Sequence, residues 1–179
     1  FYALSLLMRM RVRIPRVHFD TLQGDIAFLR LLEEKGVQLN DTPEGILADG
    51  RNVSSFTGFD VNMRDFSDQA LTVAALAPFA TSGTHITGIG HIRNQECDRI
   101  HAIVSNLQSL GIASEEDPDG VRITPGTPRA AIIQTYDDHR VAMAFSLVGL
   151  MTGEVMIENP TCCKKTFPKY FEILDRLTK

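Results

Sequence analysis

The sequence is poor in the residues that mark secreted, zinc-binding and nucleic-acid-binding proteins. It has only three cysteines, Cys97, Cys162 and Cys163, in 179 residues, and no CxxC pair. This argues against a disulfide framework or a zinc site and indicates a reducing compartment, so we expect a cytoplasmic protein. Acidic residues outnumber basic ones by 22 to 18, and no basic stripe is interleaved with aromatic residues. We therefore expect no nucleic-acid partner.

No hydrophobic run is long enough to cross a membrane. The apolar start of the chain, FYALSLLM, is much shorter than the roughly 20 residues that a membrane-spanning helix needs. It comes before the basic residues, which is the reverse of a signal peptide, and it has no initiator methionine. We expect no membrane association, and we interpret the start as the inside of a helix in a longer protein.

The order of apolar and turn residues repeats along the chain. The paired positions are Gly36/Gly111, Val37/Ile112, Pro43/Pro118, Gly45/Gly120, Asp68/Asp138, Leu71/Val141 and Gly83/Gly153. Such a long period indicates stacked α/β units, none of which can bury its own apolar face. The repeat places Asp68 and Asp138 at equivalent helix starts, and it places loop 88–97 opposite loop 159–166. Polar residues from all four places are therefore expected to converge at one end of the domain.

Hydrophobic periodicity, together with the glycine and proline positions, predicts alternating helices and strands. Helices are expected over residues 1–10, 26–35, 69–79, 98–110, 139–150 and 168–177. Strands are expected over residues 11–19, 37–39, 45–48, 53–56, 59–63, 84–87, 113–115, 120–123, 131–134 and 154–158. Asp138 is expected to cap the helix that follows it, because its side-chain oxygen can accept from the amides of the first turn.

Four polar clusters lie at or just before predicted helices. They are SDQ at 67–69, HIRNQECDR at 91–99, YDDHR at 136–140 and KKTFP at 164–168. Taken singly, each has an ordinary explanation as a helix cap, a solvated loop or a surface basic pair. Together they supply carboxylates, an imidazole and cations, and the candidates are Asp68, Glu96, Asp138, His139, Arg99, Arg140 and Lys165. Guanidinium groups and helix N-termini bind phosphate and carboxylate, and carboxylates near cations suit proton transfer. The clusters therefore predict acid–base chemistry on a doubly anionic substrate.

Other common kinds of site are missing from the sequence. There is no Walker loop, no Rossmann glycine pattern and no Ser-His-Asp arrangement. A metal site made of His139, Asp137 and Asp138 is an alternative, but no other histidine lies at ligand spacing. We therefore expect no metal ion.

Over essentially its whole length the sequence resembles the C-terminal part of the 5-enolpyruvylshikimate-3-phosphate synthases. The resemblance is carried by SDQALTVAALAPFA, QECDRIHAIVSNLQSLGI, YDDHRVAMAFSLVGL and CCKKTFPKYFEIL, in the order and at the spacing of that family. It implies an α+β fold of repeated βαβαββ units that form an inverse α/β barrel. Residues 1–39 would be the end of the first enolpyruvyl transferase domain, and residues 40–179 would be most of the second.

The resemblance also implies an activity in the shikimate pathway of aromatic amino acid biosynthesis. The enolpyruvyl group of phosphoenolpyruvate is transferred to the 5-hydroxyl of shikimate 3-phosphate, and phosphate is released. No cofactor is implied, the substrates are small molecules, and full-length members are expected to be monomeric. Because part of the family's active site lies outside this sequence, we expect the 179-residue chain alone to be inactive.

The resemblance assigns roles to particular residues. Asp68 and Glu96 match the catalytic carboxylates, Asp68 as the base beside the attacking hydroxyl and Glu96 as a proton shuttle at the methylene carbon. The phosphoenolpyruvate-binding set is matched by Arg99, His139, Arg140 and Lys165. The shikimate 3-phosphate contacts are matched by Asp68, His91 and Gln95. His91 stands where many members have asparagine and Gln95 where many have lysine, so the acceptor contact loses the charge of that lysine but keeps side chains that can hydrogen-bond.

Two alternatives to this interpretation remain open on the sequence. One is the related enolpyruvyl transferase that acts on UDP-N-acetylglucosamine, against which the YDDHR and KTFP motifs argue. The other is a non-catalytic α/β repeat module used for binding or assembly. Dependence of phosphoenolpyruvate binding on Arg140 and Lys165 would separate an enolpyruvyl transferase from such a module.

Overall fold

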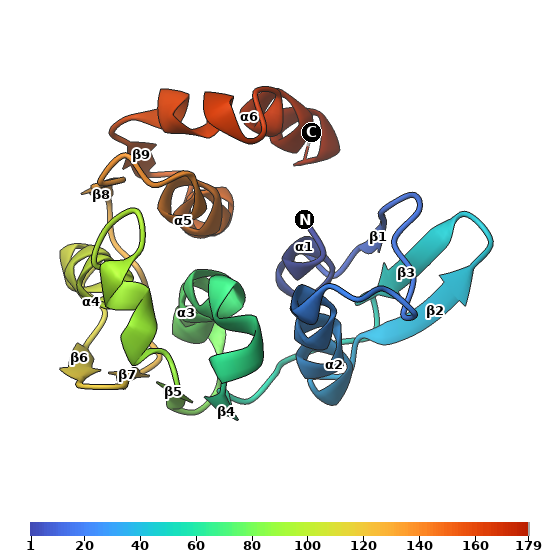
Figure 1. Ribbon diagram of the computed structural model, residues 1–179, viewed down its shortest axis with the longest axis horizontal. Helices are drawn as coiled ribbons and strands as arrows, with labels where there is room; N and C mark the ends of the chain where they lie inside the picture. Colours follow the sequence, from blue (N-terminus) through green and yellow to red (C-terminus); the bar gives the residue numbers. More distant parts are fainter. Residues whose placement is uncertain (179) are drawn as a thin grey trace. The chain divides into compact units, whose positions relative to one another are not determined.

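The computed structural model describes residues 1–178 and divides into two compact units, Phe1–Thr57 and Gly58–Lys179 (Figure 1). The sequence placed a domain boundary between residues 39 and 40, which is inside strand β2 (Gln38–Thr42). This strand pairs along its whole length with β3 (Gly45–Asp49) in an antiparallel hairpin. Since a hairpin folds as one piece, both of its strands belong to the first unit, and the boundary between the units comes after Thr57.

The first unit is a small α+β structure. Its elements are α1 (Ala3–Leu7), β1 (Arg11–Arg13), the 3-10 turn η1 (Gly24–Ile26), α2 (Ala27–Glu34), β2 and β3. The three strands form an antiparallel sheet in the order β1-β3-β2. Strand β1 ends well before residue 19, the end that the sequence predicted. Pro15 has no amide to donate to a ladder, and Arg16 has a left-handed backbone with φ of 62°.

The second unit begins with one complete βαβαββ repeat. Its elements are β4 (Asp60–Asn62), η2 (Arg64–Gln69), α3 (Ala70–Leu76), η3 (Ala77–Phe79), β5 (Thr84–Thr87), η4 (Gly90–Asn94), α4 (Arg99–Ser109), β6 (Ser114–Asp117) and β7 (Gly120–Ile123). Strands β4 and β5 are parallel and are joined through α3, and the β6–β7 hairpin extends the same sheet to give the order β4-β5-β7-β6.

A second copy of the pattern follows. Its elements are β8 (Ala131–Ile133), α5 (His139–Thr152), β9 (Val155–Ile157), η5 (Pro160–Lys165) and α6 (Tyr170–Thr178). Strands β8 and β9 are parallel and are joined through α5, as β4 and β5 are joined through α3. The structure therefore has the repeat that the paired glycines, prolines and aspartates predicted.

Helices α3 and α5 lie in the middle of this unit, with its strands toward the outside (Figure 1). Helix α3 has every residue buried except Thr72, and eight of the residues of α5 are buried, which is why both sequences carry so few charges. The two helices pack against each other. Both helices carry small, fully buried residues such as Ala70, Ala74 and Ala142, which take little room in the core. Their N-termini are thereby brought to the same region of the unit.

Two kinds of local prediction were wrong. Residues 53–56 form no strand, because Val53 closes a turn on Gly50 and the buried side chains, Val53 and Phe56, are three residues apart instead of alternating. The segments expected as loops before three of the helices each form a 3-10 helix, namely η2, η4 and η5.

In the part of the chain that the structure describes, no helix is long and apolar enough to cross a bilayer.

Gly153, which follows α5, and Gly149, which lies inside it, allow a matched test of how the C-terminus of α5 is stabilised. Gly153 follows the helix with a left-handed φ of 73°, where a side chain is strained, so Gly153→Ala should lower the free energy of unfolding by about 1 kcal/mol. Gly149 is inside the helix, and an added Cβ would make ordinary contact with Val155 at 3.4 Å. Gly149→Ala should therefore raise stability by up to about 1 kcal/mol. Urea titrations followed by circular dichroism measure both, and equal effects of the two variants would contradict this account.

Candidate active site

Asp138 is the buried anchor of the site. Its carboxylate has no exposed surface, and its Oδ1 caps α5 by accepting from the amide of Arg140 at 2.8 Å, as the sequence predicted. Its Oδ2 accepts from Nε of Arg99 at 2.7 Å. Burial opposes ionisation of Asp138, but the hydrogen bond and charge of Arg99, the amide of Arg140 and the charge of His139 together outweigh it, so the pKa of Asp138 lies below its ordinary value. A buried carboxylate is stable only when it is paired, and Arg99 is the residue that pairs it.

The turn between β8 and α5 sets the position of the Asp138 carboxylate. Tyr136 and Asp137 both have left-handed backbones, with φ of 52° and 56°, and the amide of Asp138 donates to the carbonyl of Thr135 at 2.9 Å. This conformation costs free energy for residues that carry a Cβ. The Asp137 carboxylate accepts from Nδ2 of Asn159 at 2.7 Å, which ties the turn to the segment that carries Lys165.

Arg99 connects three of the polar clusters. It is the first residue of α4, and its side chain is only 4% exposed. Besides the bond to Asp138, its Nη1 donates to Oδ1 of Asp68 at 3.0 Å and also to Oε1 of Gln95. The guanidinium fork therefore holds the N-terminal ends of α3, α4 and α5 together.

Asp68 is held by a second, more accessible cation. Its Oδ2 lies 2.7 Å from Nη2 of Arg140, and the two side chains are 37% and 30% exposed. Asp68 sits in η2 just before α3, and Arg140 is in the first turn of α5, so the pair spans the two packed helices. This is the convergence that the sequence repeat predicted for Asp68 and the YDDHR cluster.

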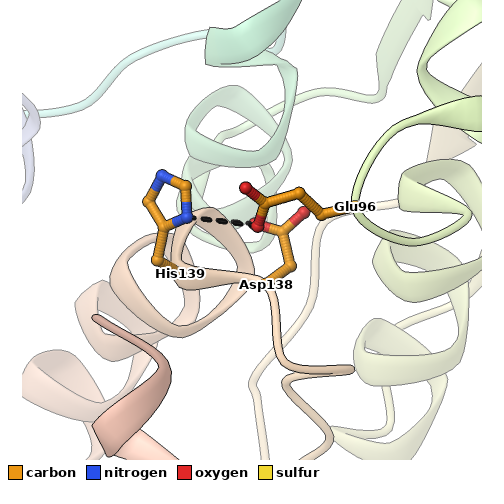
Figure 2. A group of neighbouring side chains, drawn as sticks. All are labelled: Glu96, Asp138 and His139. Carbon is orange, nitrogen blue, oxygen red and sulfur yellow. Dashed lines mark hydrogen bonds and ion pairs between the residues drawn. The ribbon is translucent and has the colours of Figure 1, made fainter. Parts of the chain in front are cut away.

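Glu96 lies beside His139 and Lys165. Its Oε2 is 3.2 Å from Nδ1 of His139 and 3.0 Å from Nζ of Lys165. Figure 2 shows Glu96 and His139 reaching toward each other from different segments, with Asp138 next to them. The hydrogen bond from Lys165 to Glu96 raises the pKa of Lys165, so this ammonium group stays charged at neutral pH.

The cations differ in how an incoming molecule could reach them. Arg99 is buried, whereas Arg140 is 30% exposed and Lys165 is 54% exposed. Each of these two more accessible cations forms an ion pair with one carboxylate, Arg140 with Asp68 and Lys165 with Glu96. A phosphate or carboxylate group could take the place of these carboxylates, while the buried Arg99–Asp138 pair keeps its geometry.

His91 and Gln95 lie at the edge of this network. Nε2 of His91 is 2.8 Å from Oγ of Ser67, the neighbour of Asp68, and Gln95 contacts Arg99. Six of the predicted site residues thus form one connected group, Gln95 joins it through Arg99, and His91 joins through Ser67. Sequence reasoning missed Ser67, and it did not anticipate how deeply Asp138 is buried. Ser67 belongs to the SDQ cluster but was not named as a site residue, and Asp138 was named as a helix cap and candidate without a signal for its burial.

The residues that come closest to a metal site are Glu96, Asp138 and His139. One potential ligand atom from each lies within 4.8 Å of the others. Lys165 already donates to Glu96 and Arg99 to Asp138, so positive charge stands beside both carboxylates. A divalent cation would have to compete with these groups, and we assign no metal to the cluster.

Two cysteines line the site and are expected to be unreactive. Burial, followed by the charge of Asp138, raises the pKa of Cys97 to about 12, and burial raises the pKa of Cys163 to about 12 as well. Because the thiolate is the reactive form, iodoacetamide at pH 7.5 should label both far more slowly in the folded protein than in urea. Mass spectrometry after timed labelling measures the rates. Labelling of Cys97 at its unfolded rate would show that the Asp138 environment is open.

Comparison with known proteins agrees with the geometry. The chain matches the family model of EPSP synthase (3-phosphoshikimate 1-carboxyvinyltransferase) over residues 1–174. The 3-phosphoshikimate 1-carboxyvinyltransferase of Nostoc punctiforme is 42% identical over 171 residues, which are 96% of this chain and 40% of that protein. The 3-phosphoshikimate 1-carboxyvinyltransferase 2 of Halalkalibacterium halodurans is 41% identical over 180 residues, which cover 99% of this chain and 40% of that protein. The chain thus spans about 40% of the length of these curated relatives.

Solved structures show the same fold. The EPSP synthase of Acinetobacter baumannii matches with a TM-score of 0.81 at 21% identity, over 98% of this chain and 43% of that one. The enolpyruvyl transferase NikO of Streptomyces tendae matches with a TM-score of 0.72 at 18% identity, over 98% of this chain and 41% of that one. The α+β inverse-barrel fold predicted from the sequence is therefore confirmed. The chain belongs to the EPSP synthase family of enolpyruvyl transferases.

Proposed function

We propose that the protein containing this chain transfers the enolpyruvyl group of phosphoenolpyruvate to the 5-hydroxyl of shikimate 3-phosphate and releases phosphate. The observation that carries this proposal is the pairing of two accessible cations with two accessible carboxylates, Arg140 with Asp68 and Lys165 with Glu96. Such a site provides both the charge that holds an anionic substrate and the groups that move protons. The names of the related proteins, 3-phosphoshikimate 1-carboxyvinyltransferases, support the shikimate acceptor over UDP-N-acetylglucosamine.

In this proposal the cations hold phosphoenolpyruvate. Arg140 and Lys165 would turn from their carboxylates to the phosphate and carboxylate of the substrate, because charged donors bind these groups strongly. Arg99 would contribute a further donor from its buried position, and His139 would donate from its ring. Positive charge around the phosphate also stabilises it as a leaving group.

The two accessible carboxylates would move the protons. Asp68 would accept the proton of the attacking hydroxyl, because it stands at the accessible side of the cation pair Arg99 and Arg140. Glu96 would deliver and remove the proton at the methylene carbon. Its contact with His139 gives that proton a neighbouring group with which to exchange. His91 and Gln95 would contact the acceptor through neutral hydrogen bonds.

A chimera tests the proposal. In it, this chain replaces the matched stretch of the Nostoc punctiforme relative, so that the rest of the relative supplies the remaining 60% or so of a full-length protein. Phosphate release that requires both phosphoenolpyruvate and shikimate 3-phosphate is the expected result. The isolated 179-residue chain is the negative control and should release none. A chimera that folds but acts on neither substrate would contradict the proposal.

Binding of phosphoenolpyruvate to the isolated chain should depend on the exposed cations. Replacing Arg140 or Lys165 by glutamine should weaken binding about tenfold or more, because each change removes a charge-assisted hydrogen bond. Isothermal titration calorimetry measures the affinity. Lys164→Gln is the matched control, since Lys164 is an exposed neighbour outside the network. Variants that bind as tightly as the unchanged chain would instead support a non-catalytic module.

We also propose that the protein acts as a cytoplasmic monomer that needs no cofactor and binds neither nucleic acid nor membrane. Its three cysteines are free, which suits a reducing compartment. Its net charge of −4 does not favour binding to the negatively charged backbone of nucleic acid. Sedimentation of the chimera and enzyme assays in the presence of a chelator test the oligomeric state and the lack of a metal requirement.

A further inference from the structure

The segment that presents Gln95 and Glu96 to the site is an irregular loop. We define the 88–98 loop as the residues between β5 and α4, which include η4 and the bends at residues 95–97. Its tip is exposed, and Glu96 meets His139 and Lys165 only through side-chain contacts. Something else must therefore fix where the Glu96 carboxylate stands.

Arg93 joins this loop to two other elements. Its Nη1 donates to both carboxylate oxygens of Asp98, at 2.9 and 3.2 Å, and lies 2.8 Å from Oε2 of Glu116. Its Nη2 donates to the carbonyl of Asp117 at 3.1 Å. Asp98 is in turn the N-cap of α4, where its Oδ1 accepts from the amide of His101 at 3.0 Å. One guanidinium thus ties the loop to the start of α4 and to strand β6.

The other end of the loop is held by the same hairpin. Asp119, in the turn between β6 and β7, accepts from the amide of Gly90 at 2.7 Å and from the amide of Gly88 at 3.2 Å. Its carbonyl also accepts from the amide of Ile89 at 3.0 Å. The β6–β7 hairpin therefore holds the loop at residues 88–90 through Asp119 and at Asp98 through Arg93. Between Arg93 and Asp98, the loop is tied to the site only through the side chains of Gln95 and Cys97 and the contacts of Glu96.

We propose that Arg93 is a positioning residue for the reaction: through its clamp on Asp98, Glu116 and the Asp117 carbonyl, it sets the place of the Glu96 carboxylate in the site. This rests on the proposed function of Glu96. Arg93 contacts none of the predicted substrate-binding or catalytic residues, so its effect on the reaction must pass through the loop. Without the clamp, the Glu96 carboxylate can move away from His139 and Lys165 even though the fold stays intact.

Kinetics of the chimera test the proposal. Arg93→Gln should lower kcat about 10- to 100-fold, with a smaller effect on KM for phosphoenolpyruvate, because misplacing a reacting group by about 1 Å costs that much. In a Glu96→Gln background the same change should cost less than about twofold, since the group it positions is already gone. Arg93→Lys should restore part of the loss. Equal losses in both backgrounds would overturn the proposal and leave Arg93 a merely structural residue.

Arg122→Gln is the matched control. Arg122 pairs with the side chain of Asp117 at 3.1 Å on the same hairpin but does not touch the loop, so its replacement should leave kcat unchanged within about twofold. A second measurement needs no activity. The ring nitrogen signals of His139 and the ammonium signal of Lys165, recorded by NMR in the 179-residue chain, should move in Arg93→Gln toward their positions in Glu96→Gln.

The two measurements separate the possible failures. If the signals move but the chimera is inactive, the proposed function fails and the positioning of Glu96 stands. If the signals stay in place in Arg93→Gln while those of Glu96→Gln move, the positioning proposal fails whatever the chimera does.

Discussion

Asp68→Asn is expected to reduce phosphate release by the chimera at least about a hundredfold, because a positioned general base contributes that much to a proton transfer. Asparagine keeps the size of the side chain and one oxygen that can accept from Arg99 or Arg140, so one of these contacts should survive. The loss should fall mainly on kcat, whereas binding of phosphoenolpyruvate to the variant should stay within a few-fold. Steady-state phosphate release at saturating concentrations of both substrates measures the loss in kcat.

Asp65→Asn is the control for this result. Asp65 lies in the same segment η2 as Asp68, on the other side of the kink at Phe66. Asp65 is exposed, so the change removes an equal charge from the same segment. Activity of this variant should be close to that of the unchanged chimera. If Asp68→Asn loses less than about tenfold, Asp68 is not the base, and its contact with two arginines has a purely structural purpose.

Asp138→Asn is expected to cause the largest loss of stability, about 3 kcal/mol or more, because it leaves the buried guanidinium of Arg99 without its closest charged partner. Urea titration of the 179-residue chain, followed by circular dichroism, measures the change. Asp68→Asn removes the other carboxylate from Arg99, but that group is partly exposed, so its loss should cost much less. Equal losses for the two variants would mean that solvent reaches the Arg99–Asp138 pair.

The pH dependence of stability gives a second test of Asp138. Its pKa in the folded state lies below the ordinary value of 3.8 that it regains on unfolding. The unfolded state therefore binds a proton at a higher pH than the folded state, and the stabilisation is complete above about pH 4. It is lost as the pH falls through the folded-state pKa. The difference in stability between the unchanged chain and Asp138→Asn should accordingly shrink below about pH 4 and be constant above it.

Helices were the part of the fold that the sequence predicted best, because their signals are local. The caps at Asp98 and Asp138 and the glycines at 111 and 153 lie next to the residues whose conformation they determine. Strand lengths were predicted less well. The hairpin of β2 and β3 belongs with β1 through pairings such as Arg11 with Asp49, and nothing near residue 39 signals such a distant partner.

The sequence predicted that the polar clusters would meet, but not how their side chains pair. The structure brings together the residues that were named from their motifs, which are Asp68, Glu96, Arg99, His139, Arg140 and Lys165. The pairing of cations with carboxylates depends on how α3, α4 and α5 pack. No short sequence motif reveals this packing. The clamp of Arg93 on Glu116 was missed for the same reason, since the two residues belong to separate elements.

The left-handed pair at Tyr136 and Asp137 constrains how this chain can change its length during evolution. Each helical residue turns the chain by about 100°. One residue inserted between β8 and Asp138 would have to be absorbed in the turn, or it would rotate the buried face of α5 away from α3. Such an insertion would break the hydrogen bond from the Asp138 amide to the Thr135 carbonyl, which closes the turn. Substitutions to glycine or asparagine at these two positions are compatible with the backbone, whereas insertions and deletions should be eliminated by selection.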